Sequence, residues 1–462
     1  MTKKKLIKTT ALVAGLAGLG YGIFYCWVSL PIATGYGAKV LGSALFITGR
    51  KAADIQGQEL NFSPVKLVSY RINYQDSSVT ASFWGLAKRK AIYRKGLGTT
   101  LVRELTEEEL RRQPFKRPLA APAGTDTSPW PAGDKTIKSW PSNIDALALS
   151  SALAGIFKEN DSLQVQTRAV VVLYQGQLVA ERYAPGFTRH TPLASWSMAK
   201  SITNALIGIL VMQHKLQIDQ PAPVPEWQSP ADPRRAITVK HLLQQTSGLD
   251  FEEHYAKSSD ATRMLFQKAD MGAYAASQPL KDPPGTVFQY TSGNSNILSR
   301  LIRHTVGDQH YHAFPYEQLF YKLGMYSALL EPDASGTYVG SSYSFATARD
   351  WARFGLLYLN DGVLDQERIL PAGWVKQSTR PAEAAKMGEY GFQFWLNAGE
   401  KRNPANRTFP TLPADMYYAN GVEGQNIFII PSKKLVVVRL GLTRKGKYDA
   451  EGFLTNIIRA IH

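Results

Sequence analysis

The chain has 462 residues, of which 44% are hydrophobic and 19% charged, so it can bury a large core and is not disordered throughout. Its one cysteine, Cys26, excludes an intramolecular disulfide framework, an all-cysteine zinc cluster and an iron–sulfur protein. The formal net charge is +16, with seven basic and no acidic residues among the first 51, and the large C-terminal part has no concentrated basic stripe. We therefore expect no nucleic-acid partner.

The N-terminus has the pattern of a membrane anchor. Four lysines among the first eight residues precede an uncharged run over Thr9–Leu30, about 33 Å long as a helix and enough to cross a bilayer. Lysines before such a span predict a cytoplasmic N-terminus and an exported body. We expect residues 1–31 to form a single-pass anchor in the inner (cytoplasmic) membrane, with the body in the periplasm or outside the cell. A cleaved signal peptide, with Ala33-Thr34-Gly35 as its cleavage site, is the alternative.

Residues 32–113 are expected to form a small β-rich domain. Its strands are predicted over Val65–Asn73, Val79–Trp84 and Thr99–Val102, where β-branched and aromatic residues concentrate. Between the last two strands, residues 88–95 form a basic cluster that fits either anionic headgroups or a solvated loop. Residues 114–141 contain six prolines and are predicted to be a linker.

Residues 142–462 are expected to form the main domain, with strands at both ends and helices between them. This order favours an α+β fold, in which one antiparallel sheet is built from N- and C-terminal pieces and a helical subdomain is inserted. The predicted strands are Thr167–Tyr174, Leu178–Tyr183, Asn426–Pro431 and Leu435–Leu440; the predicted helices include Ser197–Leu216, Val239–Gln245, Asn296–Thr305, Thr347–Leu359 and Glu451–Ile461.

Ser197 and Lys200 stand three residues apart at the start of the most apolar of these helices. Residues i and i+3 share a helix face, so the Lys200 amine is expected beside the Ser197 hydroxyl. A serine hydroxyl is a weak nucleophile until a base takes its proton, and burial disfavours the charged form of a lysine. The helix N-terminus also directs N–H groups at developing negative charge. Ser63 and Lys66 have the same spacing in a predicted strand, where it carries no such meaning.

Two further segments strengthen this interpretation, Ile237–Leu249 (ITVKHLLQQTSGL) and Pro284–Asn294 (PGTVFQYTSGN). Together with the Ser197–Lys200 motif, they resemble the serine β-lactamase, penicillin-binding protein and esterase superfamily, its class C-like branch in particular. The resemblance covers roughly residues 142–462. It implies a β-lactamase-like antiparallel sheet flanked by helices, with a helical subdomain.

The resemblance implies that Tyr290 exchanges protons with Lys200, and an ammonium beside a phenol does lower the phenol pKa. The usual Tyr-x-Asn of the family is replaced here by Tyr290-Thr291-Ser292, with Asn294 two residues further on. Tyr-x-Ser is similar to the 6-aminohexanoate-dimer hydrolase and esterase-type members. Ser292 and Asn294 are the expected substrate-binding residues of this motif, and the lost asparagine disfavours recognition of a β-lactam amide.

Ala419–Gln425 is interpreted as the third motif, with a glycine-rich hairpin turn as the alternative. The resemblance implies that Gly421, next to Asn420, permits close backbone approach. It further implies that the Val422 N–H completes an oxyanion hole with the Ser197 N–H. Gln425 is expected to bind substrate. The family's lysine, which helps to bind the carboxylate of penicillins, has no cationic replacement here, which again disfavours β-lactams.

These features predict a membrane-anchored serine hydrolase that cleaves small carboxylic esters or short linear amides through a serine acyl-enzyme. We expect no metal or other cofactor, because the eight histidines offer no His-Glu-x-x-His spacing. Two alternatives remain open: a catalytically inactive binding or scaffold protein on the same fold, and a β-lactamase or D-alanyl carboxypeptidase.

Overall fold

A computed structural model describes residues 3–115, 127–136, 141–158, 165–444 and 448–462, and the chain divides into two compact units. The N-terminal unit comprises Met1–Arg94, Thr99–Arg111 and Glu252–Ala269. The rest of the chain forms the second unit, called the catalytic unit because it contains the predicted catalytic residues Ser197, Lys200 and Tyr290. This division differs from the predicted boundaries at residues 113 and 141. The segment Glu252–Ala269 joins the N-terminal unit because its helix α7 packs against α1.

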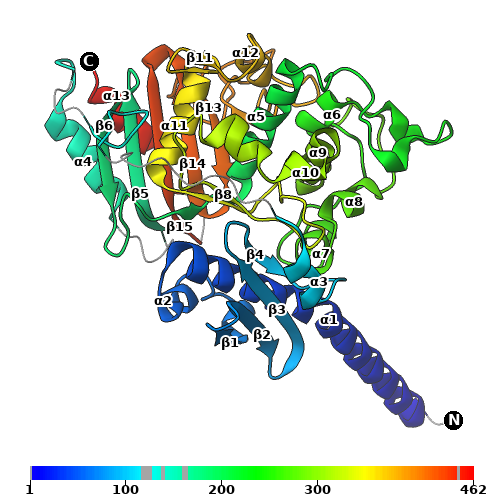
Figure 1. The fold of residues 1–462 in the computed structure, drawn as a ribbon. Helices are drawn as coiled ribbons and strands as arrows, with labels where there is room; N and C mark the ends of the chain where they lie inside the picture. Colours follow the sequence, from blue (N-terminus) through cyan, green and yellow to red (C-terminus); the bar gives the residue numbers. More distant parts are fainter. Residues whose placement is uncertain (1–2, 116–126, 137–140, 159–164, 445–447) are drawn as a thin grey trace. The chain divides into compact units, whose positions relative to one another are not determined.

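The N-terminal unit is organised around one long helix, α1 (Lys3–Thr48), which continues well beyond the predicted anchor and has Pro31 inside it. Its described side chains are exposed as far as Trp27 and mostly buried from Ala33 onward, where it packs on strands β2 and β3 (Figure 1). The side chains of the N-terminal lysines lie outside the described residues. The sheet has the order β1-β2-β3-β4. The other elements are α2 (Ala52–Gly57), β1 (Ser69–Asn73), β2 (Ser78–Phe83), β3 (Leu86–Arg94), β4 (Gly98–Leu101), α3 (Glu107–Arg112) and α7 (Asp260–Gln267).

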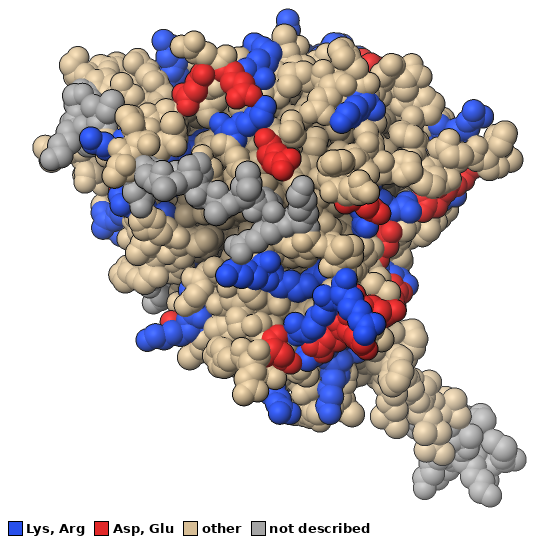
Figure 2. Space-filling model, viewed as in Figure 1, with Lys and Arg blue, Asp and Glu red and all other residues tan. Residues whose placement is uncertain are grey.

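Strand β3 was not among the predicted strands, because its centre is the basic cluster. Lys88, Arg89 and Lys90 mask the alternation that becomes apolar at the fully buried Ala91 and Ile92. In Figure 2 the basic side chains of this strand lie among acidic ones, and Lys90 forms ion pairs with Asp76 (3.2 Å) and Glu107 (2.7 Å).

The catalytic unit contains a six-stranded antiparallel sheet in the order β12-β13-β14-β15-β5-β6. Strand β15, from the C-terminal end of the chain, pairs along its length with β5, from the N-terminal end of this unit. This arrangement and the flanking helices confirm the predicted α+β fold class. The strands are β5 (Val165–Tyr174), β6 (Gln177–Tyr183), β12 (Trp395–Leu396), β13 (Tyr417–Gly421), β14 (Gln425–Ile430) and β15 (Leu435–Thr443).

Helices cover both faces of this sheet because its central strands are apolar on both sides. On one face, Leu435 and Val437 of β15 join a core with α4 (Ala146–Ile156) and α13 (Ala450–Arg459). On the other face lies α11 (Ala348–Leu359), where Gly355 lets the helix approach Val436 closely (Figure 1). Thr347 caps α11 by accepting a hydrogen bond from the Asp350 N–H.

The remaining helices form the helical part of the unit, in which α5 packs against α9. Helix α9 starts at Ser292, four residues before the predicted start, because Thr291 caps it through the Asn294 N–H. The elements are α5 (Ala199–Met212), α6 (Val239–Leu243), α8 (Met271–Ala276), α9 (Ser292–Val306), α10 (Asp308–Tyr311), α12 (Trp374–Ser378), β7 (Leu193–Ala194), β8 (Leu329–Leu330), β9 (Ser344–Ala346), β10 (Val363–Leu364) and β11 (Glu367–Arg368).

The segment predicted as a linker is partly folded onto the catalytic unit. Residues 116–126 and 137–140 lie outside the described residues. Between them, the Trp130 indole N–H donates to the Gly176 carbonyl (3.0 Å), and the Arg353 guanidinium lies 4.4 Å from the Trp130 ring centroid. Arg353 also donates to the carbonyls of Pro131 and Gly133. Residues 127–136 therefore belong structurally to the catalytic unit.

Candidate active site

Ser197 lies in a tight turn immediately before α5. The turn, a 3₁₀ segment over Trp196–Met198, starts after Ser195, whose N–H donates to the Ser344 carbonyl (2.9 Å). Trp196 has φ +49°, a left-handed conformation that is strained for a tryptophan. The turn thus holds Ser197, which is half-buried, at the N-terminal end of a helix.

Lys200 is fully buried one helical turn later, and its Nζ lies 3.2 Å from the Ser197 Oγ. The same nitrogen lies 3.3 Å from the Ser292 Oγ and 3.0 Å from the Ser341 carbonyl oxygen. The predicted i, i+3 pair is therefore in contact, and Ser292 joins it at the start of α9. Ser341 was not predicted, because a backbone carbonyl leaves no sequence signal.

Tyr290 completes this cluster. The Lys200 Nζ lies 4.8 Å from the centroid of its ring, which in turn packs at 5.2 Å on Trp395 and at 5.8 Å, edge to face, on Tyr390. Tyr390 is fully buried, and this burial, followed by the neighbouring Tyr290, raises the pKa of Tyr390 well above its usual value. Tyr390 therefore stays neutral and acts as an aromatic wall for Tyr290.

The loop after α6 fixes the Tyr290 segment in place. The Gln245 side-chain oxygen accepts hydrogen bonds from the Thr291 N–H (3.0 Å) and the Asn294 amide (2.9 Å), and the Ser247 hydroxyl donates to the other end of that amide (2.7 Å). Both ends of the buried Asn294 side chain are thus used within the protein. Its placement fits a positioning role rather than the substrate contact predicted from the sequence.

The third motif lies beside the nucleophile turn, since both β13 and β14 contact Trp196–Met198. Gly421 ends β13, and a Cβ atom at this position would overlap the Ser195 carbonyl oxygen. The close backbone approach therefore requires glycine. Val422 follows in an exposed turn, and Glu423 in the same turn has φ +66°.

Gln425 and Asn420 form hydrogen bonds within the sheet. The Gln425 amide group donates to the Gly441 carbonyl (2.6 Å) and its oxygen accepts from the Gly441 N–H (3.0 Å), at the point where the β15–β5 register shifts. The Asn420 side chain accepts from the Asn426 amide (2.9 Å). Gln425 is buried and holds the bulge, so its placement also differs from the predicted substrate contact.

Arg439 supports the third motif from inside the sheet and was not predicted as a functional residue. This fully buried side chain donates to the carbonyls of Glu423 (3.1 Å) and Gly424 (2.8 Å) and lies 4.4 Å from the Tyr448 ring centroid. Burial lowers the pKa of Arg439 to about 10. A lone arginine in the apolar strand LVVVRLGLT was the available sequence signal.

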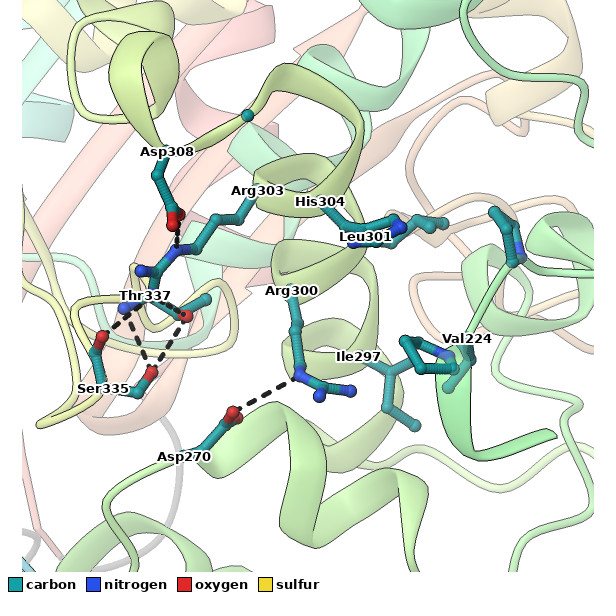
Figure 3. A pocket seen from close by; sticks show the side chains of 13 residues that line it. Val224, Asp270, Ile297, Arg300, Leu301, Arg303, His304, Asp308, Ser335 and Thr337 are labelled. Atoms are coloured by element: carbon teal, nitrogen blue, oxygen red, sulfur yellow. Dashed lines mark hydrogen bonds and ion pairs between the residues drawn. The ribbon is translucent and has the colours of Figure 1, made fainter. Parts of the chain in front are cut away.

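One cavity of the catalytic unit lies beside this cluster, and another lies against a helix that starts at it. One, of about 410 Å³, is lined by Trp395 and Asn420, which adjoin Tyr290 and Gly421, and by Glu389 and Arg407. The other, of about 450 Å³, lies against the C-terminal half of α9 (Figure 3). Its arginines are neutralised there, Arg300 by Asp270 and Arg303 by Asp308.

Within the described residues, no cluster of three or more His, Cys, Asp or Glu side chains is arranged to hold a metal ion. The contacts described above bring together a serine hydroxyl, a buried amine and a phenol, in a unit built on an antiparallel sheet flanked by helices. These features define a β-lactamase-fold serine hydrolase.

Comparison with known proteins gives the same class. The sequence profile of the family described as Beta-lactamase matches residues 154–454, and the chain belongs to this family. It is 24% identical over 329 residues to the 6-aminohexanoate-dimer hydrolase of Paenarthrobacter ureafaciens, covering 64% of this chain and 79% of that protein.

Two solved structures share the fold. A putative 6-aminohexanoate-dimer hydrolase from Bacillus anthracis superposes with a TM-score of 0.53 and 24% identity, over 64% of this chain and 78% of that one. A family VIII carboxylesterase superposes with a TM-score of 0.53 and 15% identity, over 68% and 96% of the two chains. The family match and the curated relative confirm the predicted superfamily and the assignment as a serine hydrolase.

Proposed function

We propose that this protein is a membrane-anchored hydrolase that cleaves carboxylic esters or short linear amides through an acyl-enzyme on Ser197. The contact of 3.2 Å between the Lys200 Nζ and the Ser197 Oγ is the observation that carries the proposal. It provides a base within hydrogen-bond reach of the nucleophile, in a half-buried position that a carbonyl can approach.

The surroundings of Lys200 support its role as a base. A neutral amine has two N–H groups, and the Ser341 carbonyl and the Ser292 hydroxyl lie where they can accept both (3.0 and 3.3 Å). The lone pair then faces the Ser197 hydroxyl, and burial of Lys200 disfavours the competing ammonium form.

In the proposed reaction, the Ser197 oxygen attacks the substrate carbonyl while Lys200 takes its proton, which is then passed on through Tyr290. The N–H groups of Ser197 and Val422 hold the tetrahedral oxyanion, a position that the approach of Gly421 to Ser195 supports. Tyr290 then protonates the leaving alcohol or amine. Water, deprotonated by the same bases, hydrolyses the acyl-enzyme and releases the acid.

The proposed substrate preference rests on the second and third motifs. Ser292, not asparagine, lies beside Lys200, and no lysine follows Gly421 to bind a penicillin carboxylate. The relative named for a linear amide substrate and the neighbour named as a carboxylesterase support esters and linear amides over β-lactams.

The proposed anchor is α1. Among the described residues it is the one helix long and apolar enough to cross a membrane, and its apolar side chains from Leu12 to Trp27 are exposed. We propose that it holds the catalytic unit at the outer face of the cytoplasmic membrane.

A fluorophosphonate probe tests the nucleophile. The purified chain should be labelled on Ser197, because phosphonylation needs an activated hydroxyl, and Ser197→Ala should not be labelled. Ser201→Ala is a matched control, since Ser201 lies one turn further along α5 and donates to the Gln393 carbonyl. Labelling of Ser197→Ala at the wild-type rate would contradict the assignment.

A substrate panel tests the preference separately. Turnover of p-nitrophenyl esters and short linear amides should exceed turnover of nitrocefin. Efficient nitrocefin hydrolysis with no ester hydrolysis would instead make the protein a β-lactamase. No turnover of any of these substrates, together with no labelling, would favour a non-catalytic binding protein.

A further inference from the structure

The turn between β2 and β3 in the N-terminal unit carries a tryptophan, Trp84, that is largely exposed although its ring lies 4.9 Å from that of Phe83. Phe83 pairs with Leu86, which leaves Trp84 and Gly85 as a two-residue hairpin turn. Both have positive φ, +48° and +80°. Such turns favour Asn-Gly or Asp-Gly, because a bulky side chain is strained in this conformation. Trp84 is nevertheless 79% exposed and Leu86 is 65% exposed.

This turn is fixed to α1 close to the end of its exposed apolar stretch. The Thr34 hydroxyl of α1 donates to the carbonyl of Ala87, next to the turn, at 2.7 Å. Trp27, the last fully exposed aromatic residue of the helix, is also 79% exposed. Thr34 lies four residues beyond Leu30, where the predicted membrane span ends, about 6 Å along the helix axis. The interfacial layer of a bilayer is about 5–8 Å thick on each side, so the turn lies near this layer when α1 spans the membrane.

The charge near the turn fits anionic lipid. Between Phe83 and Arg89 the chain has two basic residues, Lys88 and Arg89, and no acidic residue. Lys88, two residues beyond Leu86, is exposed. Lys90 is paired with Asp76 and Glu107 and its charge is neutralised. The basic residues that adjoin the turn are Lys88 and the half-buried Arg89. Indole rings favour the interface, and basic side chains favour the negative surface of a bilayer.

We infer that the Trp84–Leu86 turn inserts into the headgroup layer of the membrane that α1 spans and acts as a second, interfacial anchor. The inference rests on the proposed membrane anchoring. Two contacts with the membrane, joined by the Thr34–Ala87 hydrogen bond, would fix the depth and rotation of the N-terminal unit, which one helix leaves free. The expected partner is a bilayer containing anionic lipid.

Depth-dependent fluorescence quenching in the full chain tests the inference. The chain is reconstituted into vesicles of phosphatidylcholine and phosphatidylglycerol, with or without nitroxide-labelled lipids. In a Cys26→Ser background, an NBD label on Trp84→Cys should be quenched by the nitroxide lipids. Leu86→Cys gives a second reporter in case the first substitution disturbs the turn.

Tyr74→Cys is the matched control. Tyr74 is an aromatic residue of similar exposure, 67%, in the turn at the opposite end of β2, where it packs on Phe46 of α1. Phe46 is twelve residues beyond Thr34, about 18 Å further from the expected membrane surface. A label at position 74 should therefore remain in water and be unaffected by the nitroxide lipids.

A label on the native Cys26, within the exposed part of α1, separates the two proposals. If Cys26 is not quenched by the lipids, the membrane anchor itself is refuted. If Cys26 is quenched but positions 84 and 86 are not, the anchor stands and the interfacial turn is refuted. Labels at 84 and 86 that are shielded from aqueous iodide but not quenched by lipid would assign the turn to a protein contact and also overturn the inference.

Discussion

At the scale of single residues, the site depends on close contacts that leave no room for substitution. Lys200 reaches Ser197, Ser292 and Ser341 at once, and Gly421 lies against the Ser195 carbonyl. The Ser341 carbonyl and Gly421 thus hold the reactive groups in place without taking part in bond making.

Gly421→Ala should lower kcat by about 10²–10³, because the added Cβ displaces β13 from the nucleophile turn and moves the Val422 N–H, and the loss of one oxyanion donor has effects of this size. Steady-state kinetics with a p-nitrophenyl ester measures it. Gly155→Ala is the control, since a Cβ there meets open space in a helix, and it should leave kcat unchanged. Unchanged kinetics in Gly421→Ala would refute the placement of the oxyanion hole.

Arg439→Lys should lower kcat with little change in KM, because a single ammonium cannot hold both the Glu423 and Gly424 carbonyls that the guanidinium fork holds. It should also lower the free energy of unfolding by about 1–3 kcal/mol, the cost of leaving a buried carbonyl acceptor without its hydrogen bond. Arg182→Lys, exposed on β6, is the control. A loss of activity that only follows the fraction of unfolded protein would make Arg439 purely structural.

At the scale of elements, the helices and strands around the site mostly begin and end as their side chains dictate. Thr347 and Thr291 cap α11 and α9, and Thr238 and His241 form a reciprocal capping box on α6. Helix α6 matters to the site because the Gln245 loop, which holds the Tyr290 segment, follows it directly.

The α6 cap should make stability depend on pH. His241 accepts a hydrogen bond from the Thr238 N–H through Nδ1 (3.2 Å), which requires the neutral ring. Burial, and then the nearby Lys240, lowers the pKa of His241 below its usual value of 6.5. As pH falls, the unfolded chain takes up this proton first. The stabilisation is therefore complete above about pH 6.5 and is lost as the pH falls through the lowered pKa.

Urea unfolding at pH 8 and pH 5.5 measures this effect. His241→Gln, which keeps a side-chain acceptor but does not titrate in this range, should reduce the difference in unfolding free energy between the two pH values. His310→Gln, on an exposed histidine, should leave that difference as in the wild type. Equal pH dependence in both variants would show that His241 does not contribute.

At the scale of the whole molecule, the two halves of α1 differ in their surroundings. Its first half is exposed and apolar, whereas its second half, including the fully buried Ala38 and Leu41, forms the core of the small unit. In that core it packs on the strands that carry Val79 and Ile92.

Truncation distinguishes these two halves. A chain that begins at residue 31 should keep the N-terminal unit folded and need no detergent, because the described side chains that it loses are exposed as far as Trp27 and half-buried from Val28 to Leu30. A chain that begins at residue 52 should aggregate, because it exposes the apolar face of the small sheet. Size-exclusion chromatography without detergent and protection of residues 60–110 from proteolysis measure the outcome. Equal behaviour of the two chains would show that the second half of α1 is dispensable.

Local sequence determined much of this structure. The spacing of Ser197 and Lys200 on a helix, the apolar strands at both ends of the catalytic unit and the capping residue of α11 depend on neighbours a few positions apart, and the structure contains them. Strand β3 was missed because the charges of Lys88, Arg89 and Lys90 hide its alternation, and its pairing with β2 is what makes it a strand.

Only the tertiary structure decided what distant polar groups contact. Asn294 and Gln425 have residue types suited to substrate binding, but Gln245 and Gly441 use their hydrogen-bonding groups. Arg439 and the Ser341 carbonyl reach the site from other segments of the chain. The physical reason is that a buried polar group must be paired, and the partner that pairs with it is chosen by the packing of segments far apart in sequence.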